Sequence, residues 1–469
     1  MVDAGAAQHP FPHFWEQMFG SGRAVLSLRE DYRSDLRSVK RITGFSYIRF
    51  HAILDDDVGV YDEDAQGKAI YNFSYVDQIY DGLLANGVRP YVEISFMPSK
   101  LAATDTRQAF WYHPNISPPK DWSRWDALVS AFAQHLVDRY GIDEVSQWYF
   151  EVWNEPNLDF WAGTPKQETY WELYDHTAAD IKKISGRLRV GGPATAQAAW
   201  VEAMIRHCAE SRIPLDFVST HVYANDTAED VFHTQESVPR DQMVCRAVNK
   251  VHDEIKASAM PSLPLIWSEF NASYKNEPDV TDSVYMGPWL ADTIRRCDGL
   301  VDSMSYWTFS DVFEEQGVVK TPFDGGFGLL AEDGIPKPAY NAFKLLHMLG
   351  DERINLVSNS TLLTRRDDGT LVLAVWNYAP AGQAGSSKTF TLQLKGTNAQ
   401  RALISRVDQD HGDFRSTYEK MGGPQYPTKA QIQQLRQATD LPPPEDQQIE
   451  NSRLTITVPA HGLAVIELK

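Results

Sequence analysis

The segment WYFEVWNEPN, residues 148–157, contains the residues that decide the fold. Apart from Glu151, its first six residues are aromatic or β-branched, and this composition predicts a β-strand. Pro156 cannot donate a backbone hydrogen bond to a neighbouring strand, so the strand is expected to end just before it. Glu155 is therefore expected at the carboxyl end of a strand, in a rim of apolar side chains.

The segment LPLIWSEFN, residues 263–271, has the same organisation, with Glu269 between Trp267 and Phe270 at the end of an apolar run. A lone glutamate in such a place commonly begins a surface loop. Two of them in apolar rims indicate a pair of carboxylates facing one cavity. Cleavage of a glycosidic bond requires such a pair.

Between about residues 40 and 345, short apolar runs alternate with longer amphipathic stretches. This alternation predicts repeated strand–helix units and a parallel sheet. The predicted strands cover residues 24–28, 47–54, 90–97, 148–154, 189–192, 216–224, 265–271 and 304–310. Eight such units predict an α/β fold of the (β/α)8 TIM-barrel type, in which the chemistry lies at the carboxyl ends of the strands. Glu155 then follows the fourth strand, and Glu269 lies near the end of the seventh.

After residue 350 the sequence changes to short alternating segments joined by turns rich in Gly, Asp and Pro. This pattern predicts a small antiparallel β-sandwich, with a helix and a Pro-rich loop inserted at residues 418–448. We therefore expect a catalytic barrel over residues 14–345 and a second, smaller C-terminal antiparallel β-sandwich domain over residues 346–469.

The charge of the chain excludes two classes of partner. Its 469 residues carry a formal net charge of −19 at pH 7, which would repel nucleic acid and anionic membrane surfaces. A neutral or cationic ligand fits this charge better. No apolar run has the length of a membrane span, and the first residues do not have the pattern of a signal peptide. A cytoplasmic location is expected, with a periplasmic or secreted one as the alternative if a signal was removed before this numbering.

The three cysteines, Cys208, Cys245 and Cys297, lie far apart and form no CxxC pair. Their spacing predicts buried free thiols in a reducing compartment, with neither a disulfide framework nor a zinc site. The chain also contains none of the short motifs that mark nucleotide sites, metalloproteases or serine hydrolases. No cofactor and no metal are therefore expected.

Polar side chains on the second and sixth predicted strands are candidates for substrate contact. His221 and Tyr223 lie two residues apart, so both side chains face the same side of the sixth strand, next to the seventh. His51 ends the apolar run of the second strand. A purely structural role is the alternative for each histidine. Aromatic side chains such as Trp307 suit the flat faces of sugar rings, with core packing as the alternative.

The two glutamates need different environments if one attacks while the other donates a proton. Arg49, His221 and Tyr223 are the donors expected to keep Glu269 ionised. Glu151 lies inside the barrel and is expected to be a structural partner of Arg49.

FEVWNEPN and IWSEFN resemble the acid/base and nucleophile segments of the clan of retaining glycosidases with glutamates on strands four and seven. YIRFHAILDDDVGVY, NISPPKDWSRW, FVSTHVY, SYWTFSDVFEE and FDGGFGLL resemble, more narrowly, glycoside hydrolase family 39, known for β-xylosidases and α-L-iduronidases. The resemblance runs from about Phe14 to Lys469. It implies that Glu155 is the general acid/base and Glu269 the nucleophile, and that residues 1–13 join the sandwich.

The resemblance also implies that Asn154 contacts the 2-hydroxyl of the sugar. The residues that it implies around the cleaved sugar are His51, His221, Tyr223, Tyr274, Trp307 and one or both of Glu314 and Glu315.

The choice of sugar depends on the group at C5, because iduronate has a carboxylate there and xylose has only hydrogen atoms. The loop SDVFEEQG after the eighth strand is acidic, which would repel a uronate and favours xylose. The expected function is a retaining exo-acting 1,4-β-xylosidase on xylo-oligosaccharides. Alternatives are an arabinosidase, a β-glucosidase or an α-L-iduronidase on the same barrel, or a non-catalytic carbohydrate-binding protein. A small carbohydrate is the expected partner; the oligomeric state is left open, with a monomer favoured.

Overall fold

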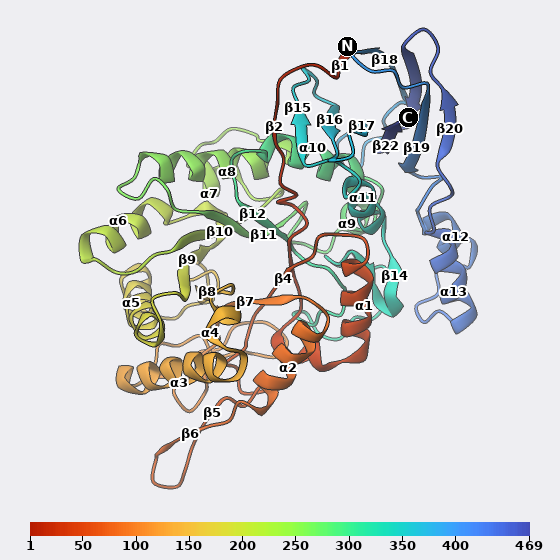
Figure 1. Cartoon of the computed structure of the whole chain (residues 1–469). Helices are drawn as coiled ribbons and strands as arrows, with labels where there is room; N and C mark the ends of the chain where they lie inside the picture. Colours follow the sequence, from red (N-terminus) through yellow and green to blue (C-terminus); the bar gives the residue numbers. More distant parts are fainter.

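The structure is a computed structural model that describes residues 1–469. Eight parallel strands close into a barrel in the order β3-β4-β7-β8-β9-β10-β11-β12. These strands are β3 (Met18–Gly20), β4 (Tyr47–Phe50), β7 (Arg89–Ile94), β8 (Tyr149–Val152), β9 (Arg189–Thr195), β10 (Phe217–Tyr223), β11 (Leu265–Asn271) and β12 (Ser303–Tyr306). The predicted fold class, a TIM barrel with additional antiparallel sheets, is confirmed (Figure 1).

The first predicted strand is wrong. Residues 24–28 form a 3-10 helix, η1 (Ala24–Leu28), and the first barrel strand is the three-residue β3. Such a short run cannot show the alternation by which strands are recognised in a sequence. The last residue of β3, Gly20, has no room for a side chain, because a Cβ there would lie 2.0 Å from Trp307 Cε3.

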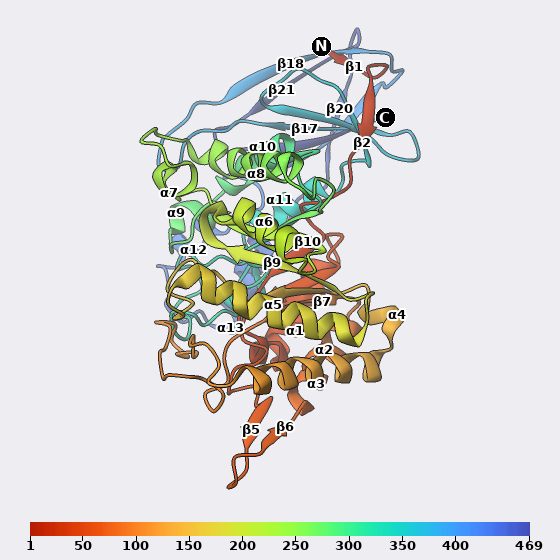
Figure 2. The same cartoon turned by 90° about the vertical axis from the view of Figure 1, so that its left-hand side faces the viewer.

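Helices cover the outside of the barrel (Figure 2). The longer ones are α1 (Glu30–Lys40), α2 (Ser74–Ala85), α3 (Trp122–Tyr140), α5 (Lys166–Ile184), α6 (Val201–Ser211), α8 (Arg240–Ala257), α10 (Met286–Cys297) and α11 (Pro338–Leu346). Short elements between them are β5 (Tyr61–Glu63), β6 (Ala69–Tyr71), α4 (Ile142–Val145), η2 (Ala196–Ala198), α7 (Ala228–Phe232), α9 (Pro278–Thr281), β13 (Leu330–Ala331), η3 (Glu332–Gly334) and β14 (Ile335–Pro336).

Local sequence explains where α3 begins and ends. The Asp121 side chain accepts hydrogen bonds from the backbone N–H groups of Ser123 and Arg124 and so caps the N-terminus of α3. Gly141, at φ 81°, ends the same helix in a conformation that residues with a Cβ rarely adopt.

No helix combines the length and the apolar composition needed to span a bilayer.

The remaining strands form a second unit of two sheets. A seven-stranded sheet has the order β2-β15-β16-β17-β22-β19-β20, and a three-stranded sheet has the order β1-β18-β21. These strands are β1 (Val2–Asp3), β2 (Gln8–Pro10), β15 (Glu352–Ile354), β16 (Thr361–Arg365), β17 (Leu371–Trp376), β18 (Lys388–Lys395), β19 (Arg401–Val407), β20 (Glu445–Gln448), β21 (Arg453–Val458) and β22 (Leu463–Leu468). All pairings are antiparallel except β1 with β18.

A core of 18 buried residues belongs to this second unit. Strands β1 and β2 bring the N-terminus of the chain into it, and both termini lie at this end of the molecule (Figure 1). We propose the division of the chain that the sequence predicts, with residues 1–13 added to the sandwich.

The segment between β19 and β20 contains α12 (Arg415–Lys420) and α13 (Lys429–Ala438). It packs on the barrel: the Phe414 ring stacks on Phe323 with centroids 3.6 Å apart, and Leu435 of α13 joins a buried cluster with Ile335. The segment therefore attaches the sandwich to the loop that follows the last barrel strand.

The prediction of free thiols is wrong for two of the three cysteines. Cys245 of α8 and Cys297 at the end of α10 form a disulfide, and Cys208 is free and buried. The helical pattern places both cysteines on adjacent outer helices, which the spacing in the sequence does not reveal. Disulfides persist mainly in oxidising compartments. The cysteines therefore no longer support the expected reducing compartment.

We expect the double variant Cys245→Ser/Cys297→Ser to be less stable than the wild type by about 2–4 kcal/mol, because its unfolded chain loses the constraint of a closed loop. Urea unfolding measures this difference. Dithiothreitol provides the matched control, since it should destabilise the wild type by a similar amount and leave the double variant unchanged. A wild type that is insensitive to reduction would contradict the prediction.

Candidate active site

A cavity of about 380 Å³ lies at the carboxyl ends of the barrel strands. Its lining includes both glutamates that the sequence singles out, Glu155 and Glu269. The other predicted site residues that line it are His51, Asn154, Tyr223, Tyr274, Trp307 and Glu315. A cavity of this size is typical of sites for small ligands.

The chain reaches the cavity in an unusual conformation after β8. Trp153 and Glu155 have φ values of 71° and 44°, in the left-handed region that residues with a Cβ rarely occupy. The Glu155 N–H donates to Ala194 O at 2.8 Å, and the Trp153 indole N–H donates to Phe160 O at 2.7 Å. These bonds hold a strained turn of the kind that is common at functional sites.

Glu269 lies within β11, directly opposite His221 of β10. The register between the two strands shifts between Thr220 and His221, and this irregularity sets the pairing. His221 and Tyr223 both contact glutamates of the site as a result.

Glu269 receives two strong donors. Its Oε1 accepts from Arg49 Nη1 at 2.6 Å, and its Oε2 accepts from the Tyr223 hydroxyl at 2.6 Å. Burial raises the pKa of Glu269 above its usual value, and the charges of Arg49 and His51 and the bond from Tyr223 offset only part of this rise. These donors favour the ionised carboxylate.

Glu155 has no such cation in contact. Its Oε1 shares a hydrogen bond of 3.0 Å with His221 Nδ1. Burial raises the pKa of Glu155 well above its usual value, and the neighbouring charge of Glu269 raises it further. His221 is not a cation, because burial and the charges of Arg49 and His51 hold its pKa well below the usual range. The environment of Glu155 therefore favours the protonated acid.

Arg49 is buried at the centre of this network. Its guanidinium donates to Glu151 at 2.6 Å, to Glu269 at 2.6 Å and to Asn154 Oδ1 at 3.0 Å. It also lies 2.8 Å from Glu93. The structure thus brings Arg49 together with Glu151 and Glu269, as the sequence predicts, and it adds the Glu93 carboxylate and the Asn154 amide.

His51 is held between two carboxylates. Its Nδ1 lies 2.7 Å from Glu93 and its Nε2 lies 3.4 Å from Glu315. Burial lowers the pKa of His51, but the charges of Glu93 and Glu315 outweigh it and raise the pKa to about 10. His51 is therefore an imidazolium at neutral pH, with its ring 4.9 Å from that of Trp307.

Two predicted cavity residues do not line the cavity. The Glu314 carboxylate pairs with Arg23 at 3.1 Å and with Arg29 at 2.7 Å, because two cations lie on its side of the loop. His221 is fully buried between Glu155 and Ser268, since the register of β10 places it behind the carboxylates. Of the pair Glu314 and Glu315, Glu315 lines the cavity, and His221 is linked to it through its hydrogen bond with Glu155.

The cavity also contains residues that the sequence reasoning did not select, and most lie on loops. They are Phe110, Leu158, Phe160, Ala196, Gln197, Asp226, Gln316 and Phe327. The sequence could have identified Asp226 as a candidate, because it is an acidic residue shortly after the sixth barrel strand. Burial raises its pKa to about 7.

The glutamates could in principle hold a metal ion, since potential ligand atoms of Glu155, His221 and Glu269 lie within 4.8 Å of one another. Arg49 and the His51 imidazolium already compensate the negative charge here and would repel a further cation. The arrangement is better suited to acid–base and nucleophilic chemistry by the two carboxylates.

Comparison with known proteins matches residues 1–451 to the Glycosyl hydrolases family 39. The chain is 38% identical to the beta-xylosidase of Geobacillus stearothermophilus over 441 residues, which cover 91% of this chain and 86% of that one. It is 28% identical over 245 residues to the alpha-L-iduronidase of Canis lupus familiaris, which cover 47% of this chain and 35% of that one. The crystal structure of a monomeric beta-xylosidase from Caulobacter crescentus has a TM-score of 0.91 at 35% identity, covering 100% of this chain and 98% of that one.

Proposed function

Because the chain belongs to glycosyl hydrolase family 39, the family that its motifs predict, we propose that it is a xylan 1,4-β-xylosidase. It releases xylose from the non-reducing ends of xylo-oligosaccharides with retention of configuration. The observation that carries this proposal is the pair Glu155 and Glu269, two carboxylates in one cavity, of which Glu155 has the more strongly raised pKa and Glu269 has the donors that favour its ionised form.

Double displacement uses this asymmetry. Glu269 attacks the anomeric carbon, and Glu155 gives its proton to the departing glycosidic oxygen, so a xylosyl ester of Glu269 forms. The ester no longer carries the charge that raises the pKa of Glu155. Glu155 then loses its proton more readily and takes a proton from the water that attacks the ester.

The separation of the carboxylates supports retention. One oxygen of Glu155 lies within 4.8 Å of one oxygen of Glu269. Retaining glycosidases have carboxyl groups about 5–5.5 Å apart, whereas inverting ones need about 6.5–9.5 Å to admit water.

The charges around the cavity support a neutral sugar. The 16 lining residues include neither Arg nor Lys. The cation among them, His51, is engaged by Glu93 and Glu315 and is not free to bind a uronate carboxylate. The Glu315 carboxylate lines the cavity beside His51, where its negative charge would repel a uronate carboxylate. These features favour xylose over iduronate.

A panel of nitrophenyl glycosides tests the choice of sugar. We expect β-D-xyloside to give the highest kcat/KM, and a preference for arabinoside, glucoside or iduronide would replace the proposal with the corresponding enzyme. Proton NMR of the first product tests the stereochemistry, because initial release of the α-anomer would exclude retention. Binding of xylobiose without turnover would favour a carbohydrate-binding protein.

The pH dependence of kcat/KM should be bell-shaped. Activity rises with pH as Glu269 loses its proton, and falls at higher pH as Glu155 loses its own. Both pKa values are raised by burial, that of Glu155 more strongly. In Glu155→Gln, assayed on a dinitrophenyl xyloside that needs no acid, we expect only the acid limb. If kcat/KM of this variant still falls at higher pH, a group other than Glu155 causes that fall.

We propose that the protein acts as a monomer, as the Caulobacter crescentus beta-xylosidase is described to be. Light scattering coupled to gel filtration tests this. A mass of about 53 kDa is expected from the composition.

A further inference from the structure

Two histidines converge on one buried glutamate at the end of the barrel opposite the cavity. Glu16 precedes β3, and a groove there is lined by His13, Glu16 and His347. The chain passes between sandwich and barrel twice at this place, in the segments 11–17 and 347–351. The two segments are joined by a backbone hydrogen bond of 2.6 Å from Phe11 N–H to Asp351 O.

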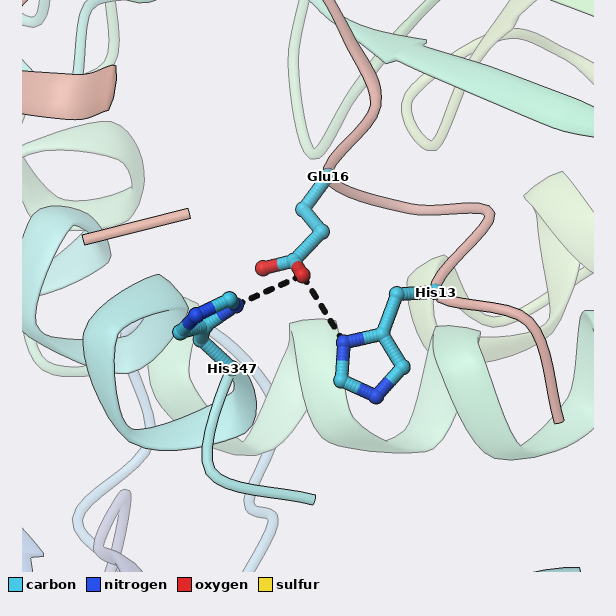
Figure 3. Close-up of side chains that lie close together, drawn as sticks. All are labelled: His13, Glu16 and His347. Carbon is cyan, nitrogen blue, oxygen red and sulfur yellow. Dashed lines mark hydrogen bonds and ion pairs between the residues drawn. The ribbon is translucent and has the colours of Figure 1, made fainter. Parts of the chain in front are cut away.

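The geometry of the cluster is compact. Glu16 Oε1 lies 2.8 Å from His13 Nδ1 and 2.7 Å from His347 Nδ1 (Figure 3). Both rings thus present the same nitrogen to the same oxygen. The Glu16 side chain is only 1% exposed, and potential ligand atoms of the three residues lie within 4.8 Å of one another.

Hydrogen bonds within the cluster leave two buried polar atoms without partners, Glu16 Oε2 and His13 Nε2. If both Nδ1 atoms of neutral histidines donate to Glu16, His13 Nε2 becomes an acceptor. Asp351 Oδ1 lies 3.9 Å from it and is also an acceptor. A proton on His13 Nε2 would point toward Asp351 but would still leave Glu16 Oε2 without a donor. Buried polar atoms without partners destabilise a fold.

A bound cation changes the role of both atoms. If His13 Nδ1 binds a metal through its lone pair, the ring proton lies on Nε2, which faces Asp351. Histidines that bind metals usually donate their other ring N–H to a carboxylate or carbonyl in this way. Glu16 Oε2 is then close enough to the ion, or to a water on it, to be satisfied.

We propose that His13 Nδ1, the Glu16 carboxylate and His347 Nδ1 bind one divalent transition-metal ion of the zinc type, with water completing the site. Two imidazoles and one carboxylate are a known zinc donor set. Tetrahedral bonds of about 2.0–2.1 Å separate ligand atoms by roughly 3.3 Å, so the rings must move apart by about half an ångström. His347 can move because its side chain is 46% exposed.

The charges around the groove favour a cation. Asp351, Asp367 and Asp368 line it. Arg366 lines it too, but its guanidinium is held by Glu467 at 2.9 Å and by the Met348 carbonyl. The metal would connect the two segments that join sandwich and barrel. Its role is structural, because the catalytic glutamates lie at the other end of the barrel strands.

Titration calorimetry of the full-length, EDTA-treated protein with zinc chloride tests the site. We expect one tightly bound equivalent and a thermal midpoint that rises by roughly 2–5 °C. His347→Ala should weaken binding by at least about 100-fold, since even outer partners of metal ligands are worth 10–100-fold. The matched control is His207→Ala, which removes a part-buried histidine whose Nε2 lies 2.8 Å from Asp175, and should bind zinc like the wild type.

Two results would overturn the proposal: no binding by the wild type, or equal binding by wild type and His347→Ala. Zinc held by Glu155 and Glu269 instead would inhibit xyloside hydrolysis and would not depend on His347. X-ray absorption at the zinc edge gives an independent readout, with two imidazole nitrogens at about 2.0–2.1 Å expected. A spectrum with oxygen ligands alone would exclude the site.

Discussion

Glu269→Ala should lose hydrolysis of every β-xyloside, by on the order of 10⁵-fold or more in kcat, because no other group can form the covalent intermediate. The proposed nucleophile is needed whatever the leaving group is. The measurement is a series of aryl xylosides with leaving groups of increasing acidity. The loss should be the same across the whole series.

Glu155→Ala is the informative counterpart in the same cavity. A general acid contributes about 10²–10⁴-fold, and this contribution disappears when the leaving group needs no proton. Glu155→Ala should therefore keep rapid formation of the xylosyl ester from a dinitrophenyl xyloside. Azide should rescue turnover by attacking that ester in place of water. Equal losses in both variants on all leaving groups would contradict the assigned roles.

Arg49→Met should be strongly destabilising, by about 3–5 kcal/mol, because it removes the cation that three buried carboxylates share. Those carboxylates are Glu93, Glu151 and Glu269. Urea unfolding measures the loss. Arg49 also lowers the pKa of Glu269, so the acid limb of the kcat/KM profile should move to higher pH.

Two further variants make this prediction decisive. Arg49→Lys keeps the charge, so it should shift the acid limb less and remain measurable if Arg49→Met does not fold. Arg89→Met removes an ion pair with Glu144 that is partly exposed, at 2.7 Å, and should cost at most about 1 kcal/mol. The prediction fails if Arg49→Met and Arg89→Met lose similar stability, or if the acid limb does not move.

Much of the fold follows from local sequence. Runs of apolar residues identify seven of the eight barrel strands, because a buried parallel strand is apolar over its whole length. The first strand could not be predicted in this way, because β3 has only three residues, and its last one, Gly20, packs against the distant Trp307 ring. The disulfide could not be predicted from local sequence either, because Cys245 and Cys297 are 52 residues apart and meet only through helix packing.

The sequence by itself determined the barrel, the positions of Glu155 and Glu269 at strand ends, and the partnership of Arg49 with Glu151. These depend on strand periodicity and on the alternation of side chains, which are local properties. The tertiary structure decided which side chains reach the cavity. Glu314 turns to Arg23 and Arg29 while its neighbour Glu315 faces His51, because charges from distant segments select the orientation of a loop. No spacing along a single chain contains that information.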